Sequence, residues 1–443
     1  MKSSAEDVSR RLYLLLDNTG HSMYMVKLRR LLYRNIPLLL KSTNGTRSIM
    51  SGSKGDGISR QCDGDFDLLV VFQHYTCTHD VYSSQAVSGE TNVFTIHISH
   101  FGYCTLELTR RGKYLCHEIK DSLVVYNGKH FLSSRMFNAE NMVMHIGEVK
   151  QTGPAQTVTY GPLIAVDNVP TLTCDCQHIL LKWASRPRKY DWPPLSLRQT
   201  ISHMNGNLVA KGMKGSETEH LEWRYCFNEI ESLILESLND TQTKLYMMLK
   251  IINRDVIQKH VFSVSSFILK NIVFWLAETF EQHMFRPETL FTWIVRSLLL
   301  LKRAVQLNYL PYYMIPERNL LPEKVKEFER LPLIQTLSDI LKSGPGVFYT
   351  CDSIKRYDCL NLKELKLLRQ KFKKEVHLGL IYLYSQYWRT LLNGHEIDPE
   401  TDEQYKHNVN DLNEQLRSGW PTSIQKKIAE CKDYDEISRL LLT

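Results

Sequence analysis

Residues 52–72 read GSKGDGISRQCDGDFDLLVVF, and this stretch decides how the rest of the chain is interpreted. The apolar run from Phe66 to Phe72 has the length of one β-strand. Side chains at positions i and i+2 of a strand point to the same side, so Asp65 and Asp67 are expected to present two carboxylates together at its start. Two anions held side by side repel each other, and a divalent metal ion is their natural partner.

A third carboxylate, Asp167, lies inside a second apolar stretch, LIAVDNVPTL. A charge within such a strand is costly unless it is paired or coordinates a metal ion. Three carboxylates on adjacent strands can hold two Mg²⁺ or Mn²⁺ ions, the arrangement used for in-line phosphoryl transfer. Two plainer interpretations stay open at this point: a solvated strand end for the Asp65–Asp67 pair, and a structural hydrogen-bond acceptor for Asp167.

The turn at Gly52 and Ser53 precedes the acidic strand and fits a phosphate cradle. Glycine allows close approach of the backbone, and Ser53 can offer both its N–H and its hydroxyl to a triphosphate. A lone Gly-Ser pair marks any turn. Joined in this order and at this spacing to the three carboxylates, however, it is similar to the signature of the polymerase-beta-like nucleotidyltransferases.

A closer resemblance covers roughly residues 5–325. The chain resembles cyclic GMP-AMP synthase and its animal relatives, the male-abnormal-21 family of cyclic GMP-AMP synthase-like receptors. The segments that carry the resemblance follow the family's order: GSKGDGISRQCDGDFDLLVVF, IAVDNVPTL, Trp192-Pro193, LEWRYCFNEIE, LYMMLKII, VSSFILKNIVFW and YLPYYMIPERNLL. The ordered series is more specific than any single motif.

The resemblance implies an α+β, bilobed nucleotidyltransferase fold, with a mixed β-sheet catalytic lobe, an N-terminal spine helix and a helical C-terminal lobe. We therefore expect a nucleotidyltransferase core over residues 1–176, a helical lobe over 177–342 and a helical extension over 343–443. The resemblance also implies synthesis of a cyclic dinucleotide second messenger, such as cyclic GMP-AMP, from ATP and GTP in innate immune sensing. Double-stranded nucleic acid typically activates such enzymes.

The family's functional positions can be matched residue by residue. Asp65, Asp67 and Asp167 match the metal ligands, here for Mg²⁺ or Mn²⁺, and Gly52 and Ser53 match the phosphate loop. The resemblance implies nucleotide contacts at five further positions: Arg224, Lys250, Ser266, Phe267 and Lys270. For the three cations the plain alternative is an ordinary charge on a helix surface, and for the phenylalanine, which replaces a base-stacking tyrosine, it is core packing.

The chain also departs from the vertebrate enzyme. Asp65 stands where that enzyme has glutamate, and Cys226 and Asn228 replace serines, which leaves the base selectivity open. The zinc-binding insertion used for DNA is absent between Glu236 and Leu245, so we expect no zinc, and RNA rather than DNA as the activator. The alternative function is that of a catalytically inert family member that acts as a nucleic-acid- or protein-binding scaffold.

Composition is ordinary for a folded protein, with 43% hydrophobic and 23% charged residues, which argues against wholesale disorder. The net charge of +7 permits nucleic-acid binding without requiring it. No apolar window reaches the roughly 18 residues of a membrane span, and the N-terminus does not resemble a secretory signal. The ten cysteines show no zinc spacing, so we expect free thiols and a location in the cytoplasm or nucleus.

Apolar periodicity predicts the order of the elements. A helix is expected over 5–42, a turn-rich stretch over 43–64, strands near 66–72, 93–99, 103–109, 123–126 and 163–172, a hairpin turn at Asn127-Gly128, a helix over 134–147, and helices over 218–238, 241–258, 262–281 and 287–307.

Three basic patches are candidate contacts for nucleic acid, with a solvated helix face as the alternative. They consist of Lys27, Arg29, Arg30 and Arg34; of Lys182, Arg186, Arg188 and Lys189; and of Lys363, Lys366, Arg369, Lys371, Lys373 and Lys374. The third patch could instead face an anionic membrane or bind nothing.

Overall fold

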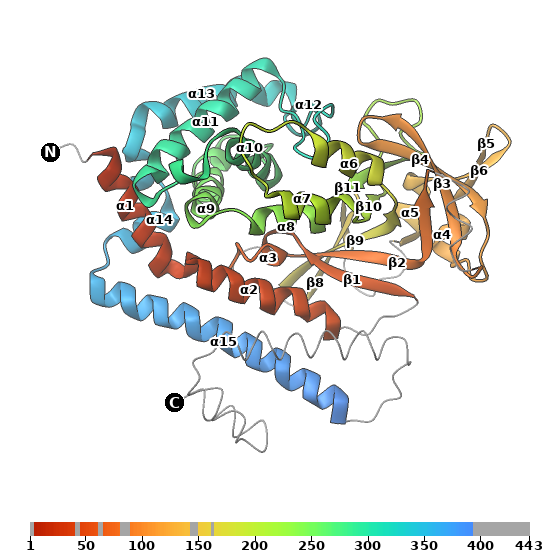
Figure 1. The fold of residues 1–443 in the computed structure, drawn as a ribbon, viewed down its shortest axis with the longest axis horizontal. Helices are drawn as coiled ribbons and strands as arrows, with labels where there is room; N and C mark the ends of the chain where they lie inside the picture. The colour runs from red at the N-terminus through yellow and green to blue at the C-terminus, as the bar shows by residue number, and fades with distance from the viewer. Residues whose placement is uncertain are drawn as a thin grey trace.

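The computed structural model describes residues 4–39, 45–60, 65–79, 89–141, 149–160 and 164–392. Figure 1 shows a sheet beside a group of helices, with the long helix α15 running along the N-terminal helix α2. The α+β class and the mixed sheet expected from the sequence are confirmed. The three predicted domain boundaries stay a prediction, and residues 393–443 of the predicted extension lie outside the described residues.

The N-terminal spine is two helices rather than the single helix expected over 5–42. Helix α1 (Ala5–Leu16) and helix α2 (Met23–Asn35) are separated by a short irregular turn, Asp17–His21. Gly20 adopts a positive φ of 86°, a conformation that glycine reaches at little cost, and Ser22 caps the second helix. A 3₁₀ turn, Ile36–Leu39, follows.

The sheet is built around strand β2 (Phe66–Thr78), which runs parallel to two of its neighbours. The path through the sheet is β1-β2-β3-β4-β11-β10-β9-β8-β7, and an additional β2–β9 pairing joins the second strand of this path to the third strand from its end. The other strands of this path are β1 (Thr46–Ser51), β3 (Asn92–His100), β4 (Tyr103–Arg110), β7 (Val149–Thr152), β8 (Ala155–Tyr160), β9 (Ile164–Cys174), β10 (Gly206–Val209) and β11 (Glu222–Cys226).

The hairpin predicted at Asn127-Gly128 is confirmed. It joins β5 (Leu123–Tyr126) to β6 (Lys129–Leu132), and both turn residues have positive φ, 49° and 76°. This is the backbone that a two-residue hairpin of type I′ requires.

One strand is unexpected, and one predicted helix is wrong. Strand β1 lies within the stretch expected to be rich in turns, and the helix expected over 218–238 is strand β11 followed by helix α8 (Asn228–Glu236). Neighbouring side chains of β11, such as Glu222 and Trp223, are both fully buried. The polar and apolar residues of β11 do alternate, but the strand has only five residues and is followed almost directly by α8, so the sequence pattern predicts a single helix across both.

The helical part begins as predicted, with α9 (Asp240–Asp255), α10 (Ser266–Thr279) and α11 (Leu290–Leu307). The later helices are α12 (Leu321–Lys324), α13 (Glu327–Ser343), α14 (Asp352–Asp358) and α15 (Leu362–Leu392). Short helices accompany the sheet: α3 (Gly52–Gly55), α4 (His117–Asp121), α5 (Ser134–Asn141), α6 (Gln177–Ser185) and α7 (Leu195–Ser202). Within the part of the chain that the structure describes, no helix is both long and apolar enough to cross a bilayer.

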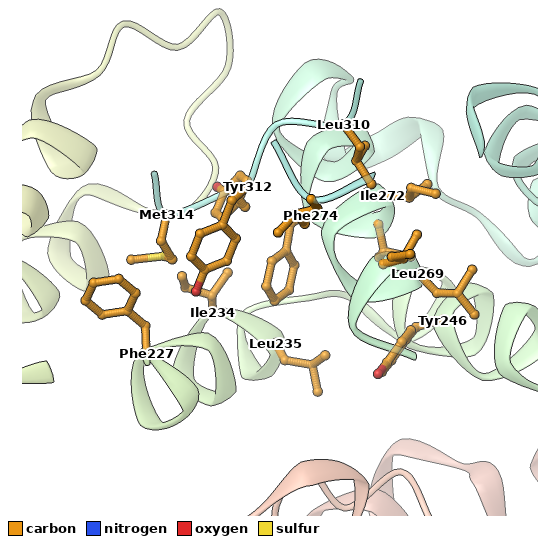
Figure 2. Close-up of a cluster of buried hydrophobic side chains, with 14 of the residues drawn as sticks. Phe227, Ile234, Leu235, Tyr246, Leu269, Ile272, Phe274, Leu310, Tyr312 and Met314 are labelled. Atoms are coloured by element: carbon orange, nitrogen blue, oxygen red, sulfur yellow. The ribbon is translucent and has the colours of Figure 1, made fainter. Parts of the chain in front are cut away.

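One continuous hydrophobic core connects the sheet with the helices. Figure 2 shows part of it, where Ile234 and Leu235 of α8 lie near Phe274 of α10 and Tyr312 of the segment that follows α11. Because α8 follows directly on strand β11, this packing fixes the helices relative to the sheet.

A second, smaller core holds helix α15 against the spine. Phe372, Val376 and Leu380 of α15 are buried with Met25, Leu28, Leu32 and Tyr33 of α2 and with Met50 and Leu68 of the sheet. The C-terminal extension therefore packs, through Phe372, Val376 and Leu380, on the same helix that supports the acidic strand.

Candidate metal and nucleotide site

Four neighbouring strands bring a row of polar residues together across the sheet. Ser51 of β1 pairs with Asp67 of β2, Asp67 pairs with Asp167 of β9, and Asp167 pairs with Thr157 of β8. Directly opposed residues of paired strands have neighbouring side chains on one face. The hydroxyl of Thr157 donates to Asp167 Oδ1 at 2.6 Å, and Asn228 Nδ2 donates to Ser51 Oγ at 2.6 Å. The two carboxylates thus lie side by side between two hydroxyl residues.

Electrostatic crowding marks Asp67 as the centre of this row. Burial, followed by the charges of Asp167 and Asp65, raises the pKa of Asp67 to about 6, and the nearby Lys250 ammonium opposes the rise only in part. A carboxylate whose charge is destabilised by like charges gains free energy when a cation is added. The row is therefore suited to a bound metal ion.

The backbone of the Gly52 turn lies directly against this carboxylate. Gly52 has a φ of 59°, and a Cβ atom there would be 1.8 Å from Asp67 Oδ2. The Cβ of any other residue would collide with the acid, so glycine is a geometric requirement at position 52. The turn opens the short helix α3 and places Ser53 at the edge of a cavity.

That cavity has a volume of about 470 Å³ and gathers four of the predicted site residues: Ser53, Asp65, Lys250 and Ser266. Burial lowers the pKa of Lys250 to about 8, while the charges of Asp56 and Asp67 act in the opposite direction. The cavity thus has one acidic residue, Asp65, in its lining together with the half-buried Lys250, whereas Asp67 and Asp167 are not among its lining residues. Its volume lies within the roughly 300–1,000 Å³ range of small-molecule sites.

The donor set fits hard divalent cations. Carboxylate oxygens are the ligands that Mg²⁺ and Mn²⁺ prefer, and the raised pKa of Asp67 shows that its charge lacks sufficient compensation. Among the described residues, no three His, Cys, Asp or Glu side chains are already gathered around a common point. Joint ligation therefore requires a side chain to rotate, and Asp65, exposed and just before the strand, is the one with room to do so.

Lys270 is not a surface charge. Its Nζ is 3.0 Å from Asp56 Oδ2 and 3.5 Å from Glu231 Oε2, and all three residues are buried. The ion pair joins α10 to the loop that follows Gly52. Lys270 therefore positions that loop, and the predicted nucleotide contact of Lys270 stays a prediction.

Arg224 and Phe267 lie apart from the cavity that contains Ser53. Phe267 is half-buried and packs against Tyr312 with ring centroids 5.5 Å apart, and its predicted nucleotide contact stays a prediction. Arg224 lies on strand β11, not on a helix surface, and it contributes to a second group of charges. That group, which sequence reasoning missed, consists of Lys211, Arg224, Arg318, Glu323 and Lys324.

Burial, together with the charges of Arg224 and Lys211, lowers the pKa of Lys324 to about 8. No spacing in the sequence indicates this group, because Lys211, Arg224 and the segment from Arg318 to Lys324 are far apart in the chain and only folding brings them together.

The basic patch predicted on the spine is mostly unavailable for nucleic acid. Arg29 Nε donates to Gly57 O at 2.8 Å, Arg30 Nε to Asp56 O at 2.8 Å and Arg34 Nε to Gly55 O at 2.9 Å. Arg29 and Arg30 are buried, and only Lys27 of this patch is exposed. The prediction of a nucleic-acid contact is therefore wrong for these buried arginines, which instead bind the backbone of the Gly52 loop.

Two arginines of the second basic patch also form internal ion pairs. Arg186 Nη2 and Arg188 Nε both contact Glu278 Oε2, at 2.6 and 3.0 Å, so these two arginines neutralise a buried carboxylate. Six cations of the third patch, in contrast, are exposed on α15: Lys363, Lys366, Arg369, Lys371, Lys373 and Lys374.

Comparison with known proteins adds one finding. Residues 241–339 match the family model described as the Mab-21 protein HhH/H2TH-like domain, which spans helices α9 to α13. The matched segment contains Lys250, Ser266, Phe267 and Lys270, whereas the three carboxylates lie outside it. No curated protein matched the chain.

Proposed function

We propose that this chain, which belongs to the nucleotidyltransferase-like Mab-21 family, synthesises a cyclic dinucleotide such as cyclic GMP-AMP from ATP and GTP. One observation carries the proposal: Asp67 and Asp167 are direct neighbours on parallel strands, with the Gly52 backbone against the first of them. A structural strand has no need of two adjacent carboxylates, one of them crowded enough to raise the pKa of Asp67, whereas phosphoryl transfer does.

Each residue then has a defined task. Asp65, Asp67 and Asp167 would hold two Mg²⁺ or Mn²⁺ ions, which when bound neutralise charge on the phosphates and activate the attacking hydroxyl. The backbone and hydroxyl of Ser53 bind the triphosphate, and Lys250, which lines the same cavity, supplies a positive charge. Arg224, Ser266 and Phe267 are proposed to contact the nucleotides, Arg224 by forked hydrogen bonds and Phe267 by stacking.

The test is incubation of the full chain with all four NTPs and Mn²⁺, with product identification by mass. Asp67→Asn is the inactive variant, and Asp339→Asn, on an exposed position of α13, is the matched control. We expect product from the native chain and the control but not from Asp67→Asn. Absence of product under every combination of nucleotide, metal ion and nucleic acid would contradict the proposal.

We further propose that double-stranded RNA is the activator. Support comes from the exposed cations of α15, which are available to contact phosphates. Arg29 and Arg30 of the spine, in contrast, donate hydrogen bonds within the protein. The assay is repeated with double-stranded RNA or DNA at increasing salt. Phosphate contacts are screened by salt, so RNA stimulation that persists unchanged at high salt would argue against this surface.

A non-catalytic scaffold is the second candidate, and one observation favours it: the described acidic side chains are not gathered around a common point. A scaffold that retains the nucleotide site would bind NTP with Mn²⁺ and release it unchanged. Equilibrium binding measured beside the product assay separates the two functions.

A further inference from the structure

The cavity that contains Ser53 and Lys250 has a wall that comes from beyond the matched family domain. Ser353, Ile354 and Tyr357 of helix α14 line it, whereas the family match ends at residue 339. The other walls are the spine turn, the loop 53–60 and helix α9. Helix α14, which follows the matched domain in the chain, thus lines the cavity that the proposed reaction uses.

Helix α14 is fixed to the elements that build the cavity. At its first turn, the backbone N–H of Ser353 donates to Asp255 Oδ2 at 2.8 Å, and Arg254 Nη2 donates to the Ser353 hydroxyl. At its end, Asp358 pairs with Arg11 of the spine at 2.7 Å. Both ends are therefore held, one by α9, the helix of Lys250, and the other by α1.

The same C-terminal extension also contacts the Gly52 loop. Arg60 Nη1 donates to the Tyr357 hydroxyl at 3.1 Å, and the Arg60 guanidinium lies 5.0 Å from the centre of the Phe372 ring of α15. The carbonyl of Arg60 in turn accepts from Lys54 Nζ at 2.6 Å. The loop that begins at Gly52 is thereby tied at its far side to α14 and α15.

The lining has the character of a nucleoside site as well as a phosphate site. Lys250 and Arg254 provide positive charge beside Asp65, where the phosphates belong. The rest of the lining combines apolar groups with hydroxyls and amides: Leu15, Ile58, Ile251, Ile354, Thr19, Asn253, Gln258 and Tyr357. Apolar faces with a few hydrogen-bonding edges suit a base and its ribose.

We propose that α14 forms the wall against which the nucleoside part of one substrate triphosphate lies, with Ile354 contacting the nucleoside and Tyr357 positioning Arg60 and the loop. This inference rests on the proposed function, since it names the surroundings of the same site. The extension is then part of the substrate pocket, and it contributes to the choice between ATP and GTP.

The test uses the full chain and measures binding, not turnover. The α,β-methylene analogues of ATP and GTP, whose reactive phosphate bond cannot be cleaved by transfer, are titrated in Mn²⁺ by calorimetry. The variants are Tyr357→Phe, which removes one hydroxyl, and Ile354→Ala, which opens the wall. Tyr349→Phe, on the 59% exposed tyrosine of the preceding turn, is the matched control. All titrations are done well below the melting temperature of every variant, so that each protein is folded.

We expect Tyr357→Phe to weaken binding about 5-fold, the effect of one hydrogen bond. We expect Ile354→Ala to change the ratio of the two affinities, which a purely structural role would leave unaltered. Native protein that binds neither analogue would overturn the proposed function. Native protein that binds, together with α14 variants indistinguishable from Tyr349→Phe, would overturn this inference and leave the proposed function standing.

Discussion

Asp56 and Asp67 are two carboxylates at opposite ends of one loop, and their surroundings differ. Burial by itself would raise the pKa of Asp56, but the Lys270 ammonium at 3.0 Å and the Ser232 hydroxyl outweigh it, so the pKa lies below its ordinary value. For Asp67 the neighbours are Asp167 and Asp65, and the pKa is raised to about 6. The fold compensates the first charge and leaves the second crowded.

This difference separates a structural acid from a site acid. Asp56 is held by α8 and α10 and keeps the loop in place, whereas Asp67 faces two other acids and the backbone of Gly52. A protein tolerates uncompensated charge where an external partner supplies the compensation. The predictions that follow test whether the two acids respond to change in opposite ways.

The largest expected effect is on catalysis. Asp67→Asn removes one negative charge and one metal-binding oxygen, and we expect product formation to fall by roughly 10³-fold or more. Melting temperature is measured alongside. A variant that folds and keeps native product levels would show that Asp67 is no more than a strand residue.

The structural side of the comparison is tested by Lys270→Met. It leaves Asp56 and Glu231 buried without their cation, and we expect the free energy of unfolding to fall by about 3–5 kcal/mol. Urea denaturation provides the measurement, and Lys342→Met, on an exposed position, should change it by less than about 0.5 kcal/mol. Equal effects of the two variants would mean that the buried cluster contributes no special stability.

A smaller effect is expected on the stability of the folded protein, which should depend on both pH and metal ions. The folded-state pKa of Asp67, about 6, lies above its ordinary value of 3.8, so the folded state favours the proton and stability is lost as pH rises through this interval. At pH 7.5 without metal ions, Asp67→Asn should therefore be more stable than the native protein, by up to roughly 2–3 kcal/mol.

Mn²⁺ should reverse this order, because it compensates the charge only in the native protein. We expect Mn²⁺ to raise the native melting temperature at pH 7.5, less so at pH 5, and to leave Asp67→Asn nearly unchanged. Equal stabilisation of both proteins would place the bound ion elsewhere.

The smallest effect concerns His79, which directly follows the last residue of strand β2. His79 Nε2 lies 3.2 Å from the Tyr225 hydroxyl, and burial together with His178 lowers its pKa to about 4 from 6.5. The folded state holds this histidine neutral, so its contribution is complete above pH 6.5 and is lost as pH falls toward 4. Between pH 6.5 and 4, His79→Gln should reduce the loss in the free energy of unfolding by about 1–2 kcal/mol. His283→Gln, at an exposed ring, should leave that loss unchanged. Identical urea profiles across this range would contradict the assignment.

Much of the site could be predicted from the sequence because its parts are local patterns. The Asp65-Phe66-Asp67 spacing and the Gly52-Ser53 turn each depend on residues next to one another. The failures have separate causes. Strand β11 has only five residues and is followed almost directly by α8, so its short alternation is easily mistaken for part of a helix. The spine arginines resemble surface charges until the Gly52 loop folds over them.

The amino-acid order alone determined the acidic strand, the glycine turn, the Asn127-Gly128 hairpin and the helices that match the family domain, since each follows from periodicity or from the conformational limits of a few neighbouring residues. Tertiary structure decided which charges are compensated, that Lys270 holds the loop, and that α14 lines the cavity. Those outcomes depend on contacts between residues far apart in the chain, and burial, which sets their energies, exists only once the chain has folded.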